Sequence, residues 1–270
     1  MKTDRYFGAV IIAVVFLASV PVIGCSRMAE KQSTSDIATL NAACDRGTYS
    51  ACVDLGTKYL AGDGMAKDNS RALALFQRSC DGRNARGCAL LGLMYDMGWG
   101  GVSKDVGRAL ELNQMACNAG SGLGCYNLGQ NYETGNGVAN DPAKAASLYQ
   151  QSCDEGEAMG CLAAGNMYWK GKGVSQDSVR AVTLYQRACD GAYAHGCYLL
   201  GLMYATGDGV SKDVAHAVKL YRTACDGGFA SGCDSLGDSY SYGYGVARDT
   251  TRAAEFYRKA CQMGEKSACK

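Results

Sequence analysis

The sequence has 270 residues, of which 47% are apolar, and this is enough for one or two domains with a hydrophobic core. Its 27 basic and 26 acidic residues leave a net charge of +1, which argues against a nucleic-acid-binding protein because such a protein needs a clustered basic surface. The unusual counts are 36 glycines and 15 cysteines, and the spacing of the cysteines predicts the fold.

Residues 1–24 are predicted to be an export signal. Lys2 and Arg5 precede an apolar run from Phe7 to Ile23, which at 17 residues is shorter than the ~20 that a membrane-spanning helix requires. The run ends in Val22-Ile23-Gly24-Cys25, which is similar to the lipobox of bacterial lipoproteins. A plain signal peptide that is cut near Gly24 is the alternative.

The lipobox resemblance implies that Cys25 carries a lipid and becomes the mature N-terminus. Residues 25–35 are then expected to form a flexible tether between the lipid and the folded chain. Because Ser26, rather than Asp, follows the lipidated cysteine, the resemblance implies an outer-membrane lipoprotein that faces the periplasm. Secretion without a lipid is the alternative.

The other 14 cysteines form pairs that are eight residues apart and recur every 36 residues, with one interval of 37. A fixed period of this length indicates a repeat architecture. The pairs are Cys44–Cys52, Cys80–Cys88, Cys117–Cys125, Cys153–Cys161, Cys189–Cys197, Cys225–Cys233 and Cys261–Cys269.

Each period predicts a helix, a turn and a second helix. In the first period Cys52, Gly56 and Tyr59 lie on one face of a helix, a Gly-x-Gly turn follows, and Asp68 is placed to cap the next helix. The small residue at position 56 and its equivalents would let two helices approach closely. Because a single hairpin cannot bury its own apolar face, residues 36–270 are predicted to form an all-α solenoid of about six stacked hairpins.

The paired cysteines are predicted to form disulfides rather than metal or redox sites. The sequence has no Cys-x-x-Cys, and its two histidines, His195 and His216, each occur in one period only, so no metal or other cofactor is expected. The export signal leads to an oxidising compartment, where disulfides persist. Each bridge would join the end of one hairpin to the start of the next, and closing a loop of about nine residues would contribute ~2.5 kcal/mol.

The repeat unit Ala/Gly-Cys-x-x-Leu-Gly-x-x-Tyr…Gly-x-Gly-Val…Asp-x-x-x-Ala-x-x-Leu-Tyr-x-x-Ala-Cys resembles the Sel1-like repeat, a relative of the tetratricopeptide repeat. The cysteine spacing resembles that of the Helicobacter cysteine-rich protein family. Over residues 36–270 the resemblance implies a right-handed superhelix of α/α hairpins with one disulfide per repeat. It also implies either binding of proteins, peptides or cell-wall fragments, or a weak, penicillin-binding β-lactamase activity that would contribute to antibiotic resistance.

The residues favour a binding scaffold over a hydrolase. Serine enzymes that recognise penicillin use Ser-x-x-Lys, Ser-Asp-Asn and Lys-Thr-Gly, and the last two are missing from the sequence. The one Ser-x-x-Lys is Ser267–Lys270, which overlaps a predicted bridge. No catalytic residue is therefore predicted. A weak β-lactamase stays the alternative, and a purely structural spacer is the third hypothesis.

The first helix of each hairpin is expected to line the concave side of the superhelix and to contact a ligand. Amide side chains beside apolar ones suit an extended peptide, whose backbone has donors and acceptors. The alternative is that the methionines pack against neighbouring helices. The expected partner is a protein or peptide, with peptidoglycan or a β-lactam as alternatives, and the membrane is reached only through the lipid. The predicted ligand contacts are Tyr126, Asn127, Asn131, Asn166, Met94 and Met203.

Overall fold

The computed structural model describes the backbone of residues 26–269 and the side chains of residues 36–269, and this part of the chain is all helical. The predicted export signal and the predicted lipid site at Cys25 lie outside the described residues. The helices are α2 (Ser26–Asp45), α3 (Tyr49–Ala61), α4 (Asn69–Asp81), α5 (Ala85–Met97), α6 (Val106–Asn118), α7 (Gly122–Thr134), α8 (Pro142–Asp154), α9 (Ala158–Lys170), α10 (Ser178–Asp190), α11 (Ala194–Thr206), α12 (Val214–Asp226), α13 (Ala230–Tyr242), α14 (Thr250–Gln262) and the 3₁₀ helix η1 (Lys266–Ala268).

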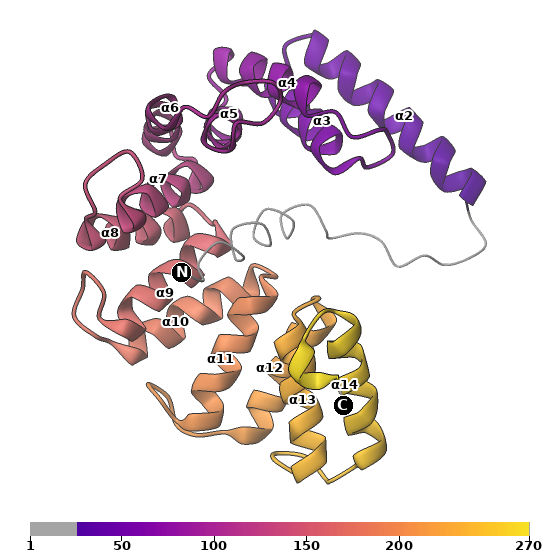
Figure 1. The fold of residues 1–270 in the computed structure, drawn as a ribbon, viewed down its shortest axis with the longest axis vertical. Helices are drawn as coiled ribbons and strands as arrows, with labels where there is room; N and C mark the ends of the chain where they lie inside the picture. Colours follow the sequence, from indigo (N-terminus) through magenta and orange to yellow (C-terminus); the bar gives the residue numbers. More distant parts are fainter. Residues whose placement is uncertain (1–25, 270) are drawn as a thin grey trace. The chain divides into compact units, whose positions relative to one another are not determined.

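Helices α3 to α14 form six hairpins, numbered repeats 1 to 6 in chain order, and in each repeat the first helix is called the A helix and the second the B helix. Repeat 1 is therefore α3 with α4, and repeat 6 is α13 with α14 (Figure 1). The chain divides into two compact units at residues 116 and 117, so that repeats 1 and 2 belong to unit 1 and repeats 3 to 6 to unit 2.

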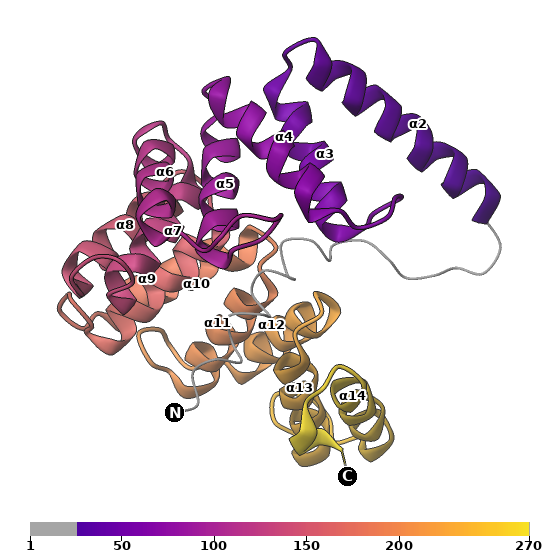
Figure 2. The ribbon, with the colours of Figure 1, turned by 45° about the horizontal axis from the view of Figure 1, so that its top comes forward.

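Within each unit the helices stack in chain order. In unit 1, α2 packs on α3, α3 on α4 and α4 on α5, as Figure 2 shows. In unit 2, every helix from α7 to α14 contacts the next one, and η1 packs on α14. The A helices of unit 2 also contact one another, α7 with α9, α9 with α11 and α11 with α13. The predicted stack of hairpins is confirmed.

The predicted aspartate caps open the B helices. Asp141, for example, accepts a hydrogen bond from the backbone N–H of Lys144 at 2.9 Å, and Pro142 occupies the first turn of α8, where its missing N–H costs no hydrogen bond. The A helices end at glycines such as Gly135, whose φ of 74° lies in the left-handed region. The other capping aspartates are Asp68, Asp105, Asp177, Asp213 and Asp249.

A glycine in each A helix lets a B-helix side chain pack directly on the helix backbone. In repeat 3, a Cβ atom on Gly129 would lie 2.7 Å from the ring of Tyr149, which is closer than real Cβ contacts come. Tyr149 is itself 1% exposed and lies in the core of unit 2. The glycines therefore set the close approach of the two helices, as the sequence predicts. The equivalent contacts are Gly56 with Phe76, Gly92 with Asn113, Gly165 with Tyr185, Gly201 with Tyr221 and Gly237 with Tyr257.

The seven predicted disulfides are present: five join successive hairpins, the first joins α2 to α3, and the last joins α14 to the residue after η1. Cys153 near the end of α8 bonds to Cys161 in the first turn of α9, and the Cα atoms of the seven pairs are 4.4 to 5.0 Å apart. Such a set of bridges is typical of a chain exported to an oxidising environment.

The structure differs from the sequence prediction in residues 26–35, where a flexible tether is expected. These residues form the first half of α2 instead. The physical reason is local: α2 contains no glycine or proline, and residues 28–32 (Met-Ala-Glu-Lys-Gln) are all strong helix formers.

Candidate functional site

The candidate site is the surface of the A helices in unit 2, where α7, α9, α11 and α13 lie next to one another. Each of these helices also packs against its own B helix, and α9, α11 and α13 pack against the B helix of the preceding repeat as well. Only a narrow stripe of each A helix therefore faces solvent, and the position of a residue on the helix decides whether a ligand can reach it.

Two of the predicted ligand contacts lie in the core. Met94 is fully buried, and Met203 is 4% exposed and packs with Tyr185, Leu200 and Leu220. In this conformation a ligand on the A-helix surface does not reach either methionine. The physical reason is the packing of each A helix on several neighbours, which buries more of its circumference than the sequence analysis assumes.

Two predicted asparagines support the local structure. Asn127 and Asn131 are only 9% and 6% exposed. The side-chain amide of Asn131 donates a hydrogen bond to the backbone oxygen of Asn136 at 3.3 Å, so it holds the Gly-x-Gly turn of repeat 3. The structure thus places both amides beneath the surface rather than on it.

Tyr126 and Asn166 lie at the surface, half-buried, as a ligand contact requires. The hydroxyl of Tyr126 accepts a hydrogen bond from the amide of Gln130 at 2.9 Å, and burial raises the pKa of Tyr126 above its ordinary value. Asn166 Oδ1 accepts a hydrogen bond from the hydroxyl of Tyr185 at 2.8 Å, which leaves its amide N–H₂ group oriented away from that tyrosine. Ligand contact stays a prediction for these two residues.

A charged group beside Tyr126 is not foreseen by the sequence analysis. Glu133 near the end of α7 accepts hydrogen bonds from Tyr149 Oη at 2.7 Å and from Lys172 Nζ at 2.8 Å. Burial alone would raise the pKa of Glu133, but the hydrogen bonds from Lys172 and Tyr149 outweigh burial and hold this pKa below its ordinary value. Lys172 comes from the Gly-x-Gly turn of repeat 4, so the pair joins two repeats at the surface.

A group of four rings at the joint of repeats 5 and 6 is also missing from the predicted site. This aromatic cluster consists of Tyr193, His195, Tyr198 and Phe229, all half-buried. The rings of His195 and Phe229 stack, with their centroids 4.6 Å apart and an angle of 14° between their planes. The ring centroid of Tyr198 lies 5.1 Å from that of Phe229. One sequence feature points to the cluster: Tyr193 and Phe229 hold the same place, directly before an A helix, in consecutive repeats.

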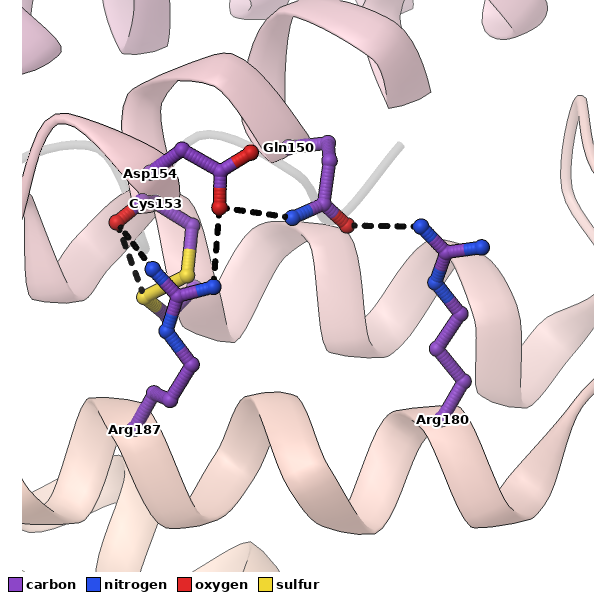
Figure 3. A network of polar contacts seen from close by, with 6 residues as sticks. Gln150, Cys153, Asp154, Arg180 and Arg187 are labelled. Atoms are coloured by element: carbon purple, nitrogen blue, oxygen red, sulfur yellow. Dashed lines mark hydrogen bonds and ion pairs between the residues drawn. A yellow bond between two sulfur atoms is a disulfide. The ribbon is translucent and has the colours of Figure 1, made fainter.

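The B-helix side of the joint between repeats 3 and 4 is a polar network (Figure 3). Arg187 on α10 donates to Asp154 Oδ1 at 2.9 Å and to the backbone oxygen of Cys153 at 2.8 Å. Gln150 bridges Asp154 to Arg180. Because Arg187 and Asp154 are both substantially exposed, this ion pair contributes about 0–1 kcal/mol, and it fixes the geometry of the joint more than its stability. The equivalent pairs are Arg78–Asp45 and Lys259–Asp226.

The remaining chemistry-bearing residues are engaged in local contacts. Ser267 donates to Glu265 at 2.8 Å and Cys269 is bonded to Cys261, while Lys270, the last residue of the Ser-x-x-Lys motif, lies outside the described residues. His195 stacks on Phe229, whereas His216 meets the ring of Tyr204 edge-on at 4.4 Å.

Neither a metal site nor a membrane span occurs in the part of the chain that the structure describes. There, no three His, Cys, Asp or Glu side chains gather as a metal ion would require. Within the same residues, no helix combines the length and the apolar character that crossing a membrane demands.

The family comparison matches the repeats one by one. The model of the Sel1 repeat family matches residues 50–84, 85–121, 122–157, 158–193, 194–229 and 230–265. These six segments are consecutive, and each contains the two helices of one hairpin. No curated protein matches the whole sequence significantly.

Three solved structures resemble the chain. A protective antigen of uropathogenic Escherichia coli with an SLR fold is 29% identical with a TM-score of 0.70, over 86% of this chain and 50% of that one, so this chain spans about half its length. A Sel1 repeat protein from Oxalobacter formigenes is 27% identical with a TM-score of 0.72, over 84% of this chain and 99% of that one. Cysteine rich protein B of Helicobacter pylori is 31% identical with a TM-score of 0.41, over 50% of this chain and 97% of that one.

Proposed function

This chain belongs to the Sel1 repeat family, and on that premise we propose that it is a disulfide-linked scaffold of the cell envelope that binds extended peptide or protein segments on the A-helix surface of unit 2. Proteins built from such repeats offer a row of adjacent helices to a partner. The proposal names a surface rather than a single pocket, because an extended segment needs contacts along several repeats.

One observation supports this surface above all others. The A helix α9 contacts both α7 and α11, and along these helices Tyr126, Asn166 and Tyr198 are half-buried side chains that carry hydroxyl or amide groups. Hydroxyl and amide groups can both donate to and accept from the backbone of an extended segment. No observation in the described residues favours β-lactam hydrolysis, and we do not propose it.

Photo-crosslinking tests the proposed surface. A photo-reactive phenylalanine analogue replaces Tyr126 or Tyr198 in cells that export the chain, and the control carries the same analogue at Val179, which is 65% exposed on the B helix α10. Mass spectrometry of the adducts should identify protein segments attached at the A-helix positions and not at the control. Equal labelling at Val179, or adducts of glycan alone, would contradict the proposal.

We further propose that Cys25 anchors the scaffold to the envelope through a lipid. Acyl chains contribute ~0.8 kcal/mol for each buried CH₂, so a lipidated N-terminus would hold the protein at a membrane without a spanning helix. Metabolic labelling with a fatty-acid analogue should label the wild-type chain and spare Cys25→Ser, which should appear in the soluble fraction. A labelled Cys25→Ser chain would exclude this anchor and leave the peptide-binding proposal intact.

A further inference from the structure

The aromatic cluster defined above spans the boundary between two repeats. Tyr193 directly precedes α11 and Phe229 directly precedes α13, and His195 and Tyr198 lie between them on the first turns of α11. The stacked rings of His195, at the start of α11, and Phe229, in the link before α13, therefore come from opposite ends of one repeat, with centroids 4.6 Å apart. Tyr198 also contacts Tyr221 of the core, with centroids 6.0 Å apart, so the cluster rests on a rigid base.

The rings of the cluster keep part of their surface in solvent. The core tyrosines Tyr185 and Tyr221 are 1% and 6% exposed, whereas every member of the cluster is half-buried. A buried ring contributes to the fold, but a solvent-facing group of aromatic rings is typical of a recognition surface. Tyr and Phe rings offer negatively polarised faces that attract cations.

Carboxylates border the cluster. Burial raises the pKa of Tyr193 and of Tyr198, and the negative charges of Glu157 beside Tyr193 and of Asp234 and Glu265 beside Tyr198 raise these values further. Glu265 is fixed in place by a hydrogen bond from the hydroxyl of Ser231 at 3.2 Å. Three acidic side chains thus lie near enough to Tyr193 and Tyr198 to act on these two rings electrostatically.

At the joint between repeats 5 and 6, Lys259 is bound to another carboxylate: it pairs with Asp226 at 3.2 Å on the B-helix side. Burial lowers the pKa of His195 below its ordinary value, so this ring is neutral near pH 7. The carboxylates whose charges act on Tyr193 and Tyr198 are those of Glu157, Asp234 and Glu265.

We infer that the aromatic cluster, together with Glu157, Asp234 and Glu265, is a site for arginine side chains, so that the ligand of unit 2 is a cationic peptide segment. This inference rests on the proposed function and specifies the chemistry of its partner. A planar guanidinium stacks on an aromatic face while its N–H groups donate to carboxylates at the edge, and the cluster offers both kinds of partner. A phosphate or a nucleic acid would be repelled by the same carboxylates.

The test measures binding of defined peptides to the mature, disulfide-linked chain by fluorescence anisotropy. The probes are labelled peptides in which Gly alternates with Arg, with Ser or with Glu. We expect the Arg peptide to bind and the other two to bind at least tenfold more weakly. Added salt should weaken the Arg peptide's binding, because its charges are screened.

Two substitutions locate the binding at the cluster. Phe229→Leu keeps an apolar side chain but removes the ring face, and Glu265→Gln keeps the hydrogen bond with Ser231 but removes the charge; each should weaken Arg-peptide binding about fivefold. The matched control is Glu255→Gln, an exposed acidic residue on α14, which should leave the affinity unchanged. Unaltered circular dichroism and Tm confirm that each variant is folded.

Equal affinity for the Arg and Ser peptides, or full affinity of Phe229→Leu and Glu265→Gln for the Arg peptide, overturns the inference. A muropeptide that binds while the Arg peptide does not also overturns it. The proposed function is tested separately: crosslinks from Tyr198 to neutral or acidic segments would retain the A-helix surface and reject only the cationic ligand. Arg-peptide binding without any crosslinked protein segment would retain the cationic ligand and reject the A-helix surface as the place where a protein partner binds.

Discussion

Repeats 1 and 3 cover the same glycine with different rings. In repeat 1, Phe76 packs on Gly56, and in repeat 3, Tyr149 packs on Gly129, with nearly the same distance between the ring and a Cβ placed on the glycine. The ring of Phe76 ends in the core, whereas the hydroxyl of Tyr149 reaches Glu133 at 2.7 Å. The ring thus sets the packing of the hairpin in both repeats. Only a tyrosine also has a hydroxyl group, which can form a hydrogen bond with a polar side chain on the A helix.

The same contact recurs in repeats 4 and 6. Tyr185 donates to Asn166 at 2.8 Å and Tyr257 donates to Asp238 at 2.7 Å. A buried hydroxyl needs a partner, so each tyrosine fixes the side chain that it reaches. The B-helix tyrosines of repeats 3, 4 and 6 therefore hold one polar side chain of each A helix in a defined position.

Gly129→Ala tests the packing half of this comparison and should have the largest effect. The added Cβ would lie 2.7 Å from the ring of Tyr149, so we expect the free energy of unfolding to fall by about 2 kcal/mol, although alanine favours helices. The control is Gly107→Ala in α6, where a Cβ has room and the Tm should rise slightly. Thermal unfolding of both variants tests this expectation. An equal rise in Tm for the two variants would show that the close approach of Tyr149 to Gly129 is not required.

Tyr149→Phe gives repeat 3 the ring of repeat 1. The variant keeps the packing but removes the hydrogen bond to Glu133, so we expect a loss of about 1 kcal/mol in the free energy of unfolding. The same change at Tyr242, which is 64% exposed, should be neutral. If denaturant titration shows no difference between Tyr149→Phe and wild type, the hydroxyl contributes nothing to the hairpin.

Glu133→Gln tests the contact between Tyr149 and Glu133 through the pH dependence of stability. The pKa of Glu133 in the folded chain lies below its ordinary value of 4.5, so the carboxylate stabilises the fold above that pH. As the pH falls through the folded-state pKa, this contribution is lost. The Tm difference between wild type and Glu133→Gln should therefore be constant near neutral pH and shrink in acid; a difference that does not vary with pH would contradict the assignment.

Ala192→Gly should have the smallest effect and stabilise the chain. Ala192 and Arg83 adopt φ values of 58° and 62° at the loop position where Gly120, Gly156 and Gly228 stand in other repeats. A non-glycine residue is strained there, and relief of this strain outweighs the extra freedom of glycine in the unfolded chain by about 0.5 kcal/mol. We expect a small rise in Tm for Ala192→Gly and for Arg83→Gly, whereas Gly156→Ala should lower it.

The fold could be predicted from the sequence because its determinants are local and repeated. A cysteine pair, a glycine, a capping aspartate and a Gly-x-Gly turn return in each period, and each acts on its immediate neighbours. The helical start of α2 differs from the predicted tether because the polar composition of residues 26–35 indicates a tether, whereas residues 28–32 individually favour a helix.

The candidate site could be predicted only in part. Whether an A-helix residue faces solvent depends on its own B helix, the preceding B helix and the adjacent A helices, and one period of sequence does not contain all these neighbours. Met94 and Met203, predicted as ligand contacts, are therefore buried, while Tyr126 and Asn166 are half-buried and their ligand contact stays a prediction. The aromatic cluster combines residues of two repeats, so no pattern within a single repeat reveals it.

The position of the disulfides has a consequence for how the chain withstands proteases. Each bridge, such as Cys153–Cys161, encloses only the short link between two successive helices, and no bridge crosses a Gly-x-Gly turn. A cut in the link at Glu155 would leave both fragments covalently joined, whereas a cut in the turn at Gly135–Gly137 would release two separate polypeptides under denaturing, non-reducing conditions. The exposed turns, and not the joints, are thus the places where a single cleavage severs the molecule.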